Sequence, residues 1–195
     1  MALLQKAIRA HAKGEIDLAK KLYQKCLSAR IDDPILYQNY GALLKQGNDL
    51  ENSERVLNLG NKKYPHRVSI LVNRANLYIK ANKLSFALND LLHSLRLIQN
   101  NLDKKGDSES VDVWLKTIRL ARELGLEEWS IELCRTALSW HPEESQIRIE
   151  TLITLQNIFS KKEDNQDVLS ELRSKQLGIE LEKAPVEVKL EALLT

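Results

Sequence analysis

The stretch "YQNYGALLKQGND", from Tyr37 to Asp49, has the pattern of a helix that ends at Gly47 and is followed by a turn at Asn48. Asn39 lies inside this predicted helix, close to the small residue Gly41. An Asn is a poor interior helix residue, because its side chain competes for backbone hydrogen bonds. The chain nevertheless repeats the arrangement at Asn73, which lies 34 residues later. This recurrence indicates an internal repeat.

A period of 34 residues relates this stretch to the segments before and after it. Moved forward by 34, Gly41 falls on Ala75 and Asn48 falls on Asn82. Three further series follow the same period, namely Ala19, Ser53 and Ala87, then Tyr23, Leu57 and Leu91, then Cys26, Gly60 and Ser94. Small residues in two of these series predict that paired antiparallel helices approach closely, with large residues of a neighbouring repeat filling the remaining space. Each pair buries its apolar face only by stacking on the next.

These residues resemble the tetratricopeptide repeat (TPR) family. The second repeat follows the family's order of residue types at Tyr37, Gly41, Leu44, Ser53, Leu57, Gly60 and Pro65. The resemblance implies an all-α fold, a right-handed alpha-solenoid of about five helix-turn-helix repeats with a C-terminal capping helix. The opening segment is also similar to bacterial TPR regions that precede glycosyltransferase, sulfotransferase or methyltransferase domains. That similarity implies a recruiting region of a larger transferase, without catalysis of its own.

We expect one solenoid over residues 1–183 and a short capping helix or linker over residues 184–195. The predicted repeats cover residues 1–33, 34–67, 68–100, 111–143 and 144–183. Ala87 and Ser130 occupy equivalent positions of the third and fourth repeats, but they are 43 residues apart instead of 34. Nine extra residues therefore lie between these two repeats. The polar segment 99–110 is the predicted insert, as a loop or a helix extension.

Composition and charge restrict the classes of protein to be considered. No run of about 18 apolar residues occurs, and the N-terminal stretch lacks the unbroken apolar segment of a secretion signal, so we expect a cytoplasmic protein without a membrane span. Residues 1–100 carry 16 Lys and Arg against 8 Asp and Glu, whereas residues 101–195 carry 13 against 19. A basic first half favours an acidic partner, or the acidic half of another copy, although a solvated surface explains it equally well.

Catalytic, cofactor and metal motifs are missing from the sequence, so we expect no enzyme, no cofactor and no metal site. The seven glycines are scattered rather than gathered in a phosphate-binding loop. The four histidines are too far apart to form a ligand set, and Cys26 and Cys134 fit buried packing positions. Cys134 and His141 lie two helical turns apart, but the packing position of Cys134 disfavours a catalytic pair.

The first helix of each repeat is expected to line the concave groove. Helical spacing places Asn39 and Gln46 on one face of the second repeat, and Asn73, Asn76 and Lys80 on the same face of the third. Gln5 occupies the matching position of the first repeat. The resulting series Gln5, Asn39, Asn73 is similar to the asparagine ladder in the repeat region of O-GlcNAc transferases, and only the two asparagines match that motif.

Two interpretations of these carboxamides stay open. An amide offers both a donor and an acceptor, so a row of them can hold the backbone of an extended peptide. The alternative is that Asn39 and Asn73 tie neighbouring helices together by bonding backbone carbonyls. In the fourth repeat Lys116, Arg119 and Glu123 take the corresponding positions and depart from the ladder.

The favoured function is a non-enzymatic module that binds a protein or peptide segment in the groove, as a scaffold or adaptor. A self-assembling structural module, or homo-oligomer, is the alternative from another class. RNA binding is disfavoured, because the basic excess is confined to one half of the chain. Trp129 and Trp140 fit either partner anchors or residues that cover the junction between the fourth and fifth repeats.

Overall fold

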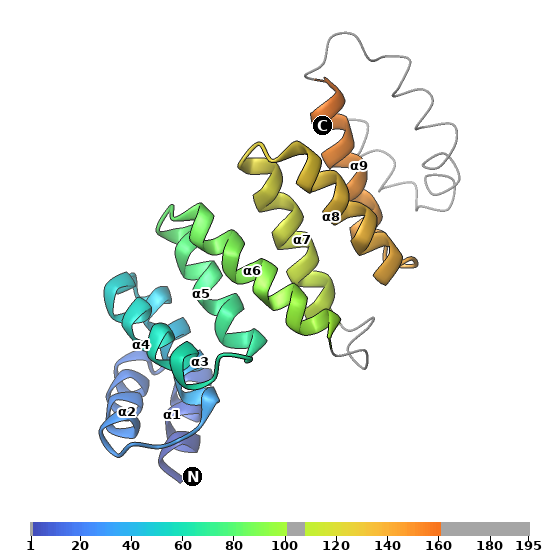
Figure 1. The fold of residues 1–195 in the computed structure, drawn as a ribbon. Helices are drawn as coiled ribbons and strands as arrows, with labels where there is room; N and C mark the ends of the chain where they lie inside the picture. Colours follow the sequence, from blue (N-terminus) through green and yellow to red (C-terminus); the bar gives the residue numbers. More distant parts are fainter. Residues whose placement is uncertain (1, 101–107, 161–195) are drawn as a thin grey trace. The chain divides into compact units, whose positions relative to one another are not determined.

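The computed structural model describes residues 2–100 and 108–160, and this part of the chain is helical throughout apart from short connections (Figure 1). Successive helices pair as antiparallel hairpins, as the period of 34 predicts. The helices are α1 (Ala2–Ala12), α2 (Ile16–Ser28), α3 (Pro34–Gln46), α4 (Leu50–Lys63), α5 (Val68–Lys80), α6 (Leu84–Gln99), α7 (Ser108–Glu123), α8 (Glu127–Trp140) and α9 (Ser145–Ser160).

Side-chain caps fix where the helices of the second repeat begin. Asp33 precedes α3, and its carboxylate accepts a hydrogen bond of 2.9 Å from the backbone N–H of Ile35. Pro34 takes the first helical position, where its missing N–H costs no hydrogen bond. Asp49 caps α4 in the same way, by accepting from the N–H of Asn52. Such caps contribute about 1 kcal/mol each.

The four turns inside the hairpins share one backbone conformation. Gly14, Asn48, Asn82 and Gly125 all have positive φ, at 76°, 61°, 56° and 71°. At Asn48, the backbone N–H bonds the carbonyl of Lys45, and the next N–H, of Asp49, bonds the carbonyl of Leu44. Equivalent pairs of bonds occur at the other three turns. Gly and Asn adopt this left-handed conformation at the least cost, which explains why only these two residue types occupy the position.

Close helix packing occurs at the small residues that define the repeat. A Cβ added to Gly41 would lie 2.5 Å from Cγ of Leu57, and one added to Gly60 would lie 2.5 Å from Cβ of Tyr37. The buried hydroxyl of Ser53 donates a hydrogen bond of 2.8 Å to the carbonyl of Gly41. Helices α3 and α4 therefore meet with almost no side chain between them, as the small-residue series predicts.

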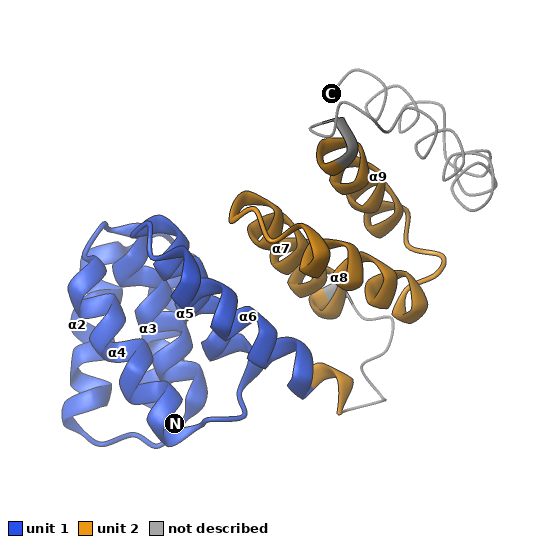
Figure 2. Ribbon diagram, turned by 45° about the horizontal axis from the view of Figure 1, so that its top comes forward, with its two compact units in different colours: residues 1–97 blue, residues 98–195 orange. Residues whose placement is uncertain are grey.

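The chain divides into two compact units, residues 1–97 and residues 98–195 (Figure 2). In the first unit α3 contacts both α1 and α5, and the core includes Tyr23, Leu36, Leu57 and Ile70. In the second unit α7, α8 and α9 contact one another. Trp114, Ile118 and Ile147 are fully buried there. The first helices of consecutive repeats thus lie side by side within each unit.

Both ends of the predicted insert 99–110 are helical, since α6 extends to Gln99 and α7 begins at Ser108. Residues 101–107 between them, the second helix of the predicted fifth repeat and the capping helix 184–195 lie outside the described residues. Across 2–100 and 108–160, no helix has the length and apolar character needed to cross a membrane.

Candidate functional site

The groove residues predicted from the sequence come together on three neighbouring helices of the first unit. Gln5 lies on α1, Asn39 and Gln46 lie on α3, and Asn73, Asn76 and Lys80 lie on α5. The three asparagines are half-buried, whereas the two glutamines and the lysine are exposed. Because α3 contacts α1 on one side and α5 on the other, the six residues belong to one helical layer. We call this set the carboxamide surface.

Two residues of the carboxamide surface, both on α5, bond α3, the first helix of the preceding repeat. The Nδ2 group of Asn73 donates to the backbone carbonyl of Gln38 at 3.4 Å, and Nζ of Lys80 donates to the carbonyl of Lys45 at 2.9 Å. Both contacts reach back 35 residues, so they repeat the same step from α5 to α3. The ammonium of Lys80 also lies at the negative end of the α3 dipole, which is a favourable position for a cation.

Asn39 makes a contact of a different kind, with a buried tyrosine of the preceding repeat. Burial raises the pKa of the Tyr23 hydroxyl, and a side-chain hydrogen bond with Asn39 partly opposes that rise. The ring of Tyr23 stacks on Tyr40, with 5.5 Å between the ring centroids. Asn39 of α3 therefore contacts a side chain of α2, whereas Asn73 bonds a backbone carbonyl of α3.

These contacts use only part of the hydrogen-bonding capacity of the carboxamides. Each amide carries two N–H donors and an oxygen that can accept two bonds. The bond from Asn73 to Gln38 employs one donor, and the second donor and the oxygen of this amide take no part in it. A side chain fixed by a neighbouring helix is also a better ligand, because it loses less rotamer freedom on binding.

The second unit carries a charged cluster in the corresponding layer. Glu150 of α9 is buried, and its carboxylate lies 2.5 Å from Nε of Arg119 and 2.7 Å from Nη1 of Arg122, both on α7. Arg122 also donates to the hydroxyl of Thr154 at 3.0 Å. Arg119 was predicted on this face from helical spacing, whereas Glu150 was missed. The signal was a carboxylate within the largely apolar run "IRIETLITL", since a buried carboxylate requires a cation nearby.

A buried ion pair in the first unit was also missed. Arg74 of α5 and Asp90 of α6 form two bonds of 2.6 and 2.7 Å, with side chains only 15% and 3% exposed. The hydrogen bond with Asp90 raises the pKa of the Arg74 guanidinium. Arg74 further donates to Asn58 of α4 at 2.9 Å. One guanidinium thus links three consecutive helices behind the carboxamide surface.

Cys134 and His141 have structural contacts rather than the arrangement of a nucleophile and a base. Burial raises the pKa of the Cys134 thiol to about 11, so the thiol is protonated at neutral pH and is a poor nucleophile. Nε2 of His141 lies 3.0 Å from the hydroxyl of Ser110, and both side chains are buried. This contact joins the end of α8 to the start of α7. In the second repeat Tyr64 bonds Asp32 at the matching position.

Paired helices, one shared turn and small residues at the helix contacts define the fold as a TPR-like helical repeat. No protein-family model matches the chain, and a search of curated proteins found no match. Solved structures do resemble it. A tetratricopeptide repeat protein from Parabacteroides merdae is similar with a TM-score of 0.68 at 17% identity, covering 89% of this chain and 65% of that one. MamA AMB-1 has a TM-score of 0.64 at 16% identity, covering 97% of this chain and 95% of that one.

A second MamA structure gives the same result. Its TM-score is 0.65 at 14% identity, and the match covers 78% of this chain and 84% of that one. At such identities the likeness concerns the fold alone. The all-α helical repeat predicted from the 34-residue period is confirmed.

Proposed function

We propose that this chain is a non-catalytic scaffold or adaptor that binds a protein or peptide segment on the carboxamide surface. The observation that carries the proposal is the placement of Asn39 and Asn73 on adjacent, packed helices, where the bond of Asn73 to Gln38 orients its amide and uses only one of its donors. The backbone of an extended peptide offers one donor and one acceptor per residue, which carboxamides match without regard to sequence.

The spacing of the helices suits this form of recognition. Packed helices lie about 8–10 Å apart, and an extended peptide rises about 3.3 Å per residue. Successive carboxamides would therefore meet every third peptide residue. The exposed Gln5, Gln46 and Lys80 flank the asparagines and supply side-chain contacts that add preference for particular peptides.

Charge favours an acidic or mixed-charge segment as the guest. The first 100 residues carry twice as many basic as acidic residues. A surface of one sign raises the local concentration of oppositely charged partners and increases their rate of association. The contribution of the guest's acidic residues to the affinity should therefore decrease as the salt concentration rises, whereas the contribution of the amide hydrogen bonds should persist.

The experiment is a pull-down with peptide mapping, followed by binding measurements on the mapped peptide. We expect Asn39→Ala with Asn73→Ala to weaken binding roughly 5- to 150-fold, because two or more hydrogen bonds worth about 1 kcal/mol each are lost. Asn89→Ala is the matched control, since Asn89 is an exposed carboxamide on α6. Equal affinity in the double variant and the control would refute the proposed site.

A further inference from the structure

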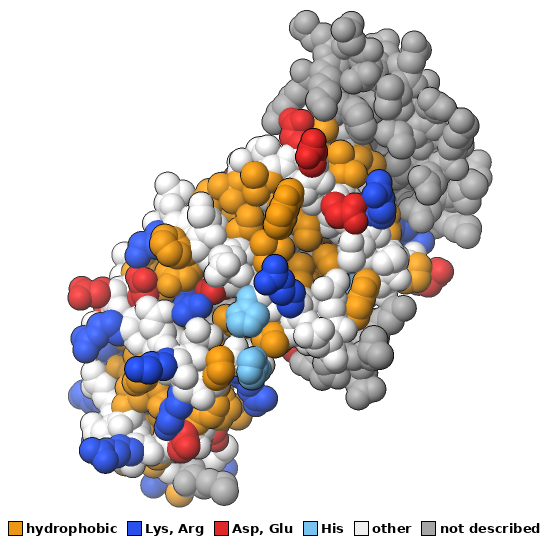
Figure 3. Space-filling model, viewed as in Figure 1, with side chains coloured by type: hydrophobic (Ala, Val, Ile, Leu, Met, Phe, Trp, Pro, Cys, Tyr) orange, Lys and Arg blue, Asp and Glu red, His pale blue; other side chains and the backbone are white. Residues whose placement is uncertain are grey.

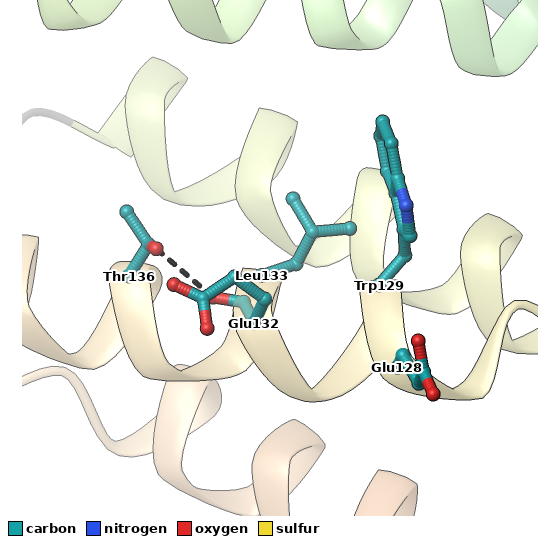
Figure 4. A pocket seen from close by; sticks show the side chains of 5 residues that line it. All are labelled: Glu128, Trp129, Glu132, Leu133 and Thr136. Carbon is teal, nitrogen blue, oxygen red and sulfur yellow. Dashed lines mark hydrogen bonds between the residues drawn. The ribbon is translucent and has the colours of Figure 1, made fainter.

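Helix α8 presents an exposed apolar and acidic face. Trp129 is 54% exposed and Leu126 is 39% exposed. Figure 4 shows Trp129 standing away from the helix, beside a hollow that Leu133 and Thr136 also line. Glu128 and Glu132 border the same hollow, and Glu132 also forms an exposed ion pair of 2.9 Å with Arg135 one turn along the helix. An exposed Trp among apolar neighbours and a polar rim is typical of an interaction surface, because large aromatic side chains supply much of the binding energy at interfaces.

Helices α2, α3 and α4 of the first unit line a pocket, called here the α2–α4 pocket, that carries two cations and one carboxylate, Asp49. The pocket has a volume of about 330 Å³, and Leu59 at its edge is 49% exposed. Its polar lining includes the cations Lys20 and Arg55. The apolar lining includes Leu27, Leu44, Val56 and Leu59, together with the ring of Tyr40. Figure 3 shows Lys and Arg side chains over α2 and α4 with hydrophobic side chains between them.

The cations of this pocket differ in their internal partners. Lys20 is paired with Asp49 at 3.3 Å, so part of its charge is already balanced. The Arg55 guanidinium donates to the neutral amide oxygen of Asn52 in the same helix, at 3.5 Å. Arg55 is therefore the stronger candidate to meet a carboxylate from outside. The volume lies at the small end of the range of roughly 300–1,000 Å³ that holds a drug-sized ligand, so it suits one large side chain with its flanking residues.

We propose that α8 of one copy docks into the α2–α4 pocket of a second copy, with Trp129 entering the pocket and the rim glutamates facing Lys20 and Arg55. A second copy of this chain is the occupant because it brings both the apolar anchor and the complementary charge. The two surfaces lie on different units of one chain, so the contact is heterologous and each copy in a dimer keeps one unused surface. Association by such contacts continues past the dimer, to a ring where the rotation between copies closes and to an open filament where it does not.

The test is light scattering of the full chain at increasing protein concentration, in low and in high salt. In low salt we expect the average molecular mass to increase with protein concentration. At the same protein concentration the mass should be lower in high salt, because salt screens the charges at the rim. Arg55→Glu and Glu132→Lys should each reduce association. An equimolar mixture of these two variants should restore it, because residue 132 of one then again faces a residue 55 of opposite charge on the other.

Two further variants separate specific docking from non-specific association of an unfolded or charged chain. Lys62→Glu changes the same charge on an exposed site of α4 outside the pocket, and it should associate like the wild type. Trp129→Ala should abolish association while the melting temperature stays close to the wild-type value. The proposal is overturned by a wild-type mass that stays monomeric at every concentration, by a mixture that fails to restore association, or by a Trp129→Ala chain that still associates.

Discussion

Gly60→Ala tests whether the small residues of the repeat are required by packing. The new Cβ would lie 2.5 Å from Cβ of Tyr37, 3.0 Å from its Cγ and 3.4 Å from Cδ1 of Ile70. Carbon atoms in contact normally lie about 3.5–4.0 Å apart, so the overlap with Tyr37 is about 1 Å. A Cβ atom cannot move by changing rotamer, and α3 itself would have to shift. Overpacking of this kind costs about 1–3 kcal/mol, and we expect the upper end.

Helix propensity opposes part of this cost. Replacing a helical Gly by Ala gains about 1 kcal/mol, so the net loss should be about 2 kcal/mol. For a chain of this size that corresponds to a decrease in melting temperature of roughly 4–8 °C. Circular dichroism during thermal and urea unfolding measures both quantities.

Gly47→Ala is the matched control for Gly60→Ala. Gly47 follows α3 with a φ of −73°, and an added Cβ would lie 3.6 Å from the carbonyl oxygens of Leu43 and Leu44, which is ordinary contact. This variant should be as stable as the wild type or slightly more stable. A Gly60→Ala chain with wild-type stability, or an equal loss in Gly47→Ala, would show that close packing of α3 and α4 does not explain the glycine.

Other predictions concern the ion pair, a turn and a thiol. Asp90→Ala should lower the free energy of unfolding in urea by about 3–5 kcal/mol, because it removes the carboxylate that pairs with the largely buried Arg74 guanidinium. The double variant Arg74→Met with Asp90→Leu should lower it far less, since it leaves no charge without a partner. Equal losses in the two variants would contradict this prediction. Gly125→Val should cost at least 1–2 kcal/mol at its φ of 71°, whereas Gly125→Asn should be tolerated, as Asn is at Asn48. Burial holds the pKa of Cys134 at about 11, so the unfolded thiol ionises first as pH rises. Stability should therefore decrease above about pH 8.5, and Cys134→Val should reduce that dependence. Burial also raises the pKa of the Cys26 thiol, so a part of the dependence should persist in this variant.

Much of the fold could be predicted from the sequence because the residue preferences of turns and of close helix contacts act between positions near one another in the chain. The 34-residue period carries the turn residues, whose backbone conformation only Gly and Asn adopt cheaply, and the small residues, whose size sets the distance between paired helices. Asn48 is an example of a residue type that indicates a positive φ, and Gly60 is an example of one that indicates close packing of two helices. Helical spacing alone placed the members of the carboxamide surface on α1, α3 and α5, whereas their role in binding stays a prediction.

The polar partners could not be predicted in the same way, because they join residues of different helices. Asp90 and Glu150 were visible as acidic residues within apolar helices, but the cations that reach them, Arg74 and Arg122, lie 16 and 28 residues earlier in the chain. The bond from Asn73 to Gln38 depends on the register of α5 against α3. The pocket between α2 and α4 depends on how the side chains of two helices leave space between them, which periodicity does not specify.

The central claim is that Asn39 and Asn73 hold a guest as well as their neighbouring helices. Its most direct test measures affinity for a mapped peptide and thermal stability on the same Asn39→Ala, Asn73→Ala chain. The bond from Asn73 to Gln38 and the contact of Asn39 with Tyr23 contribute about 1 kcal/mol each, so the melting temperature should decrease by roughly 4–8 °C at most. We expect the chain to remain folded and binding to weaken at least about fivefold. A large loss of stability with unchanged affinity would contradict the claim and leave the two asparagines a purely structural role.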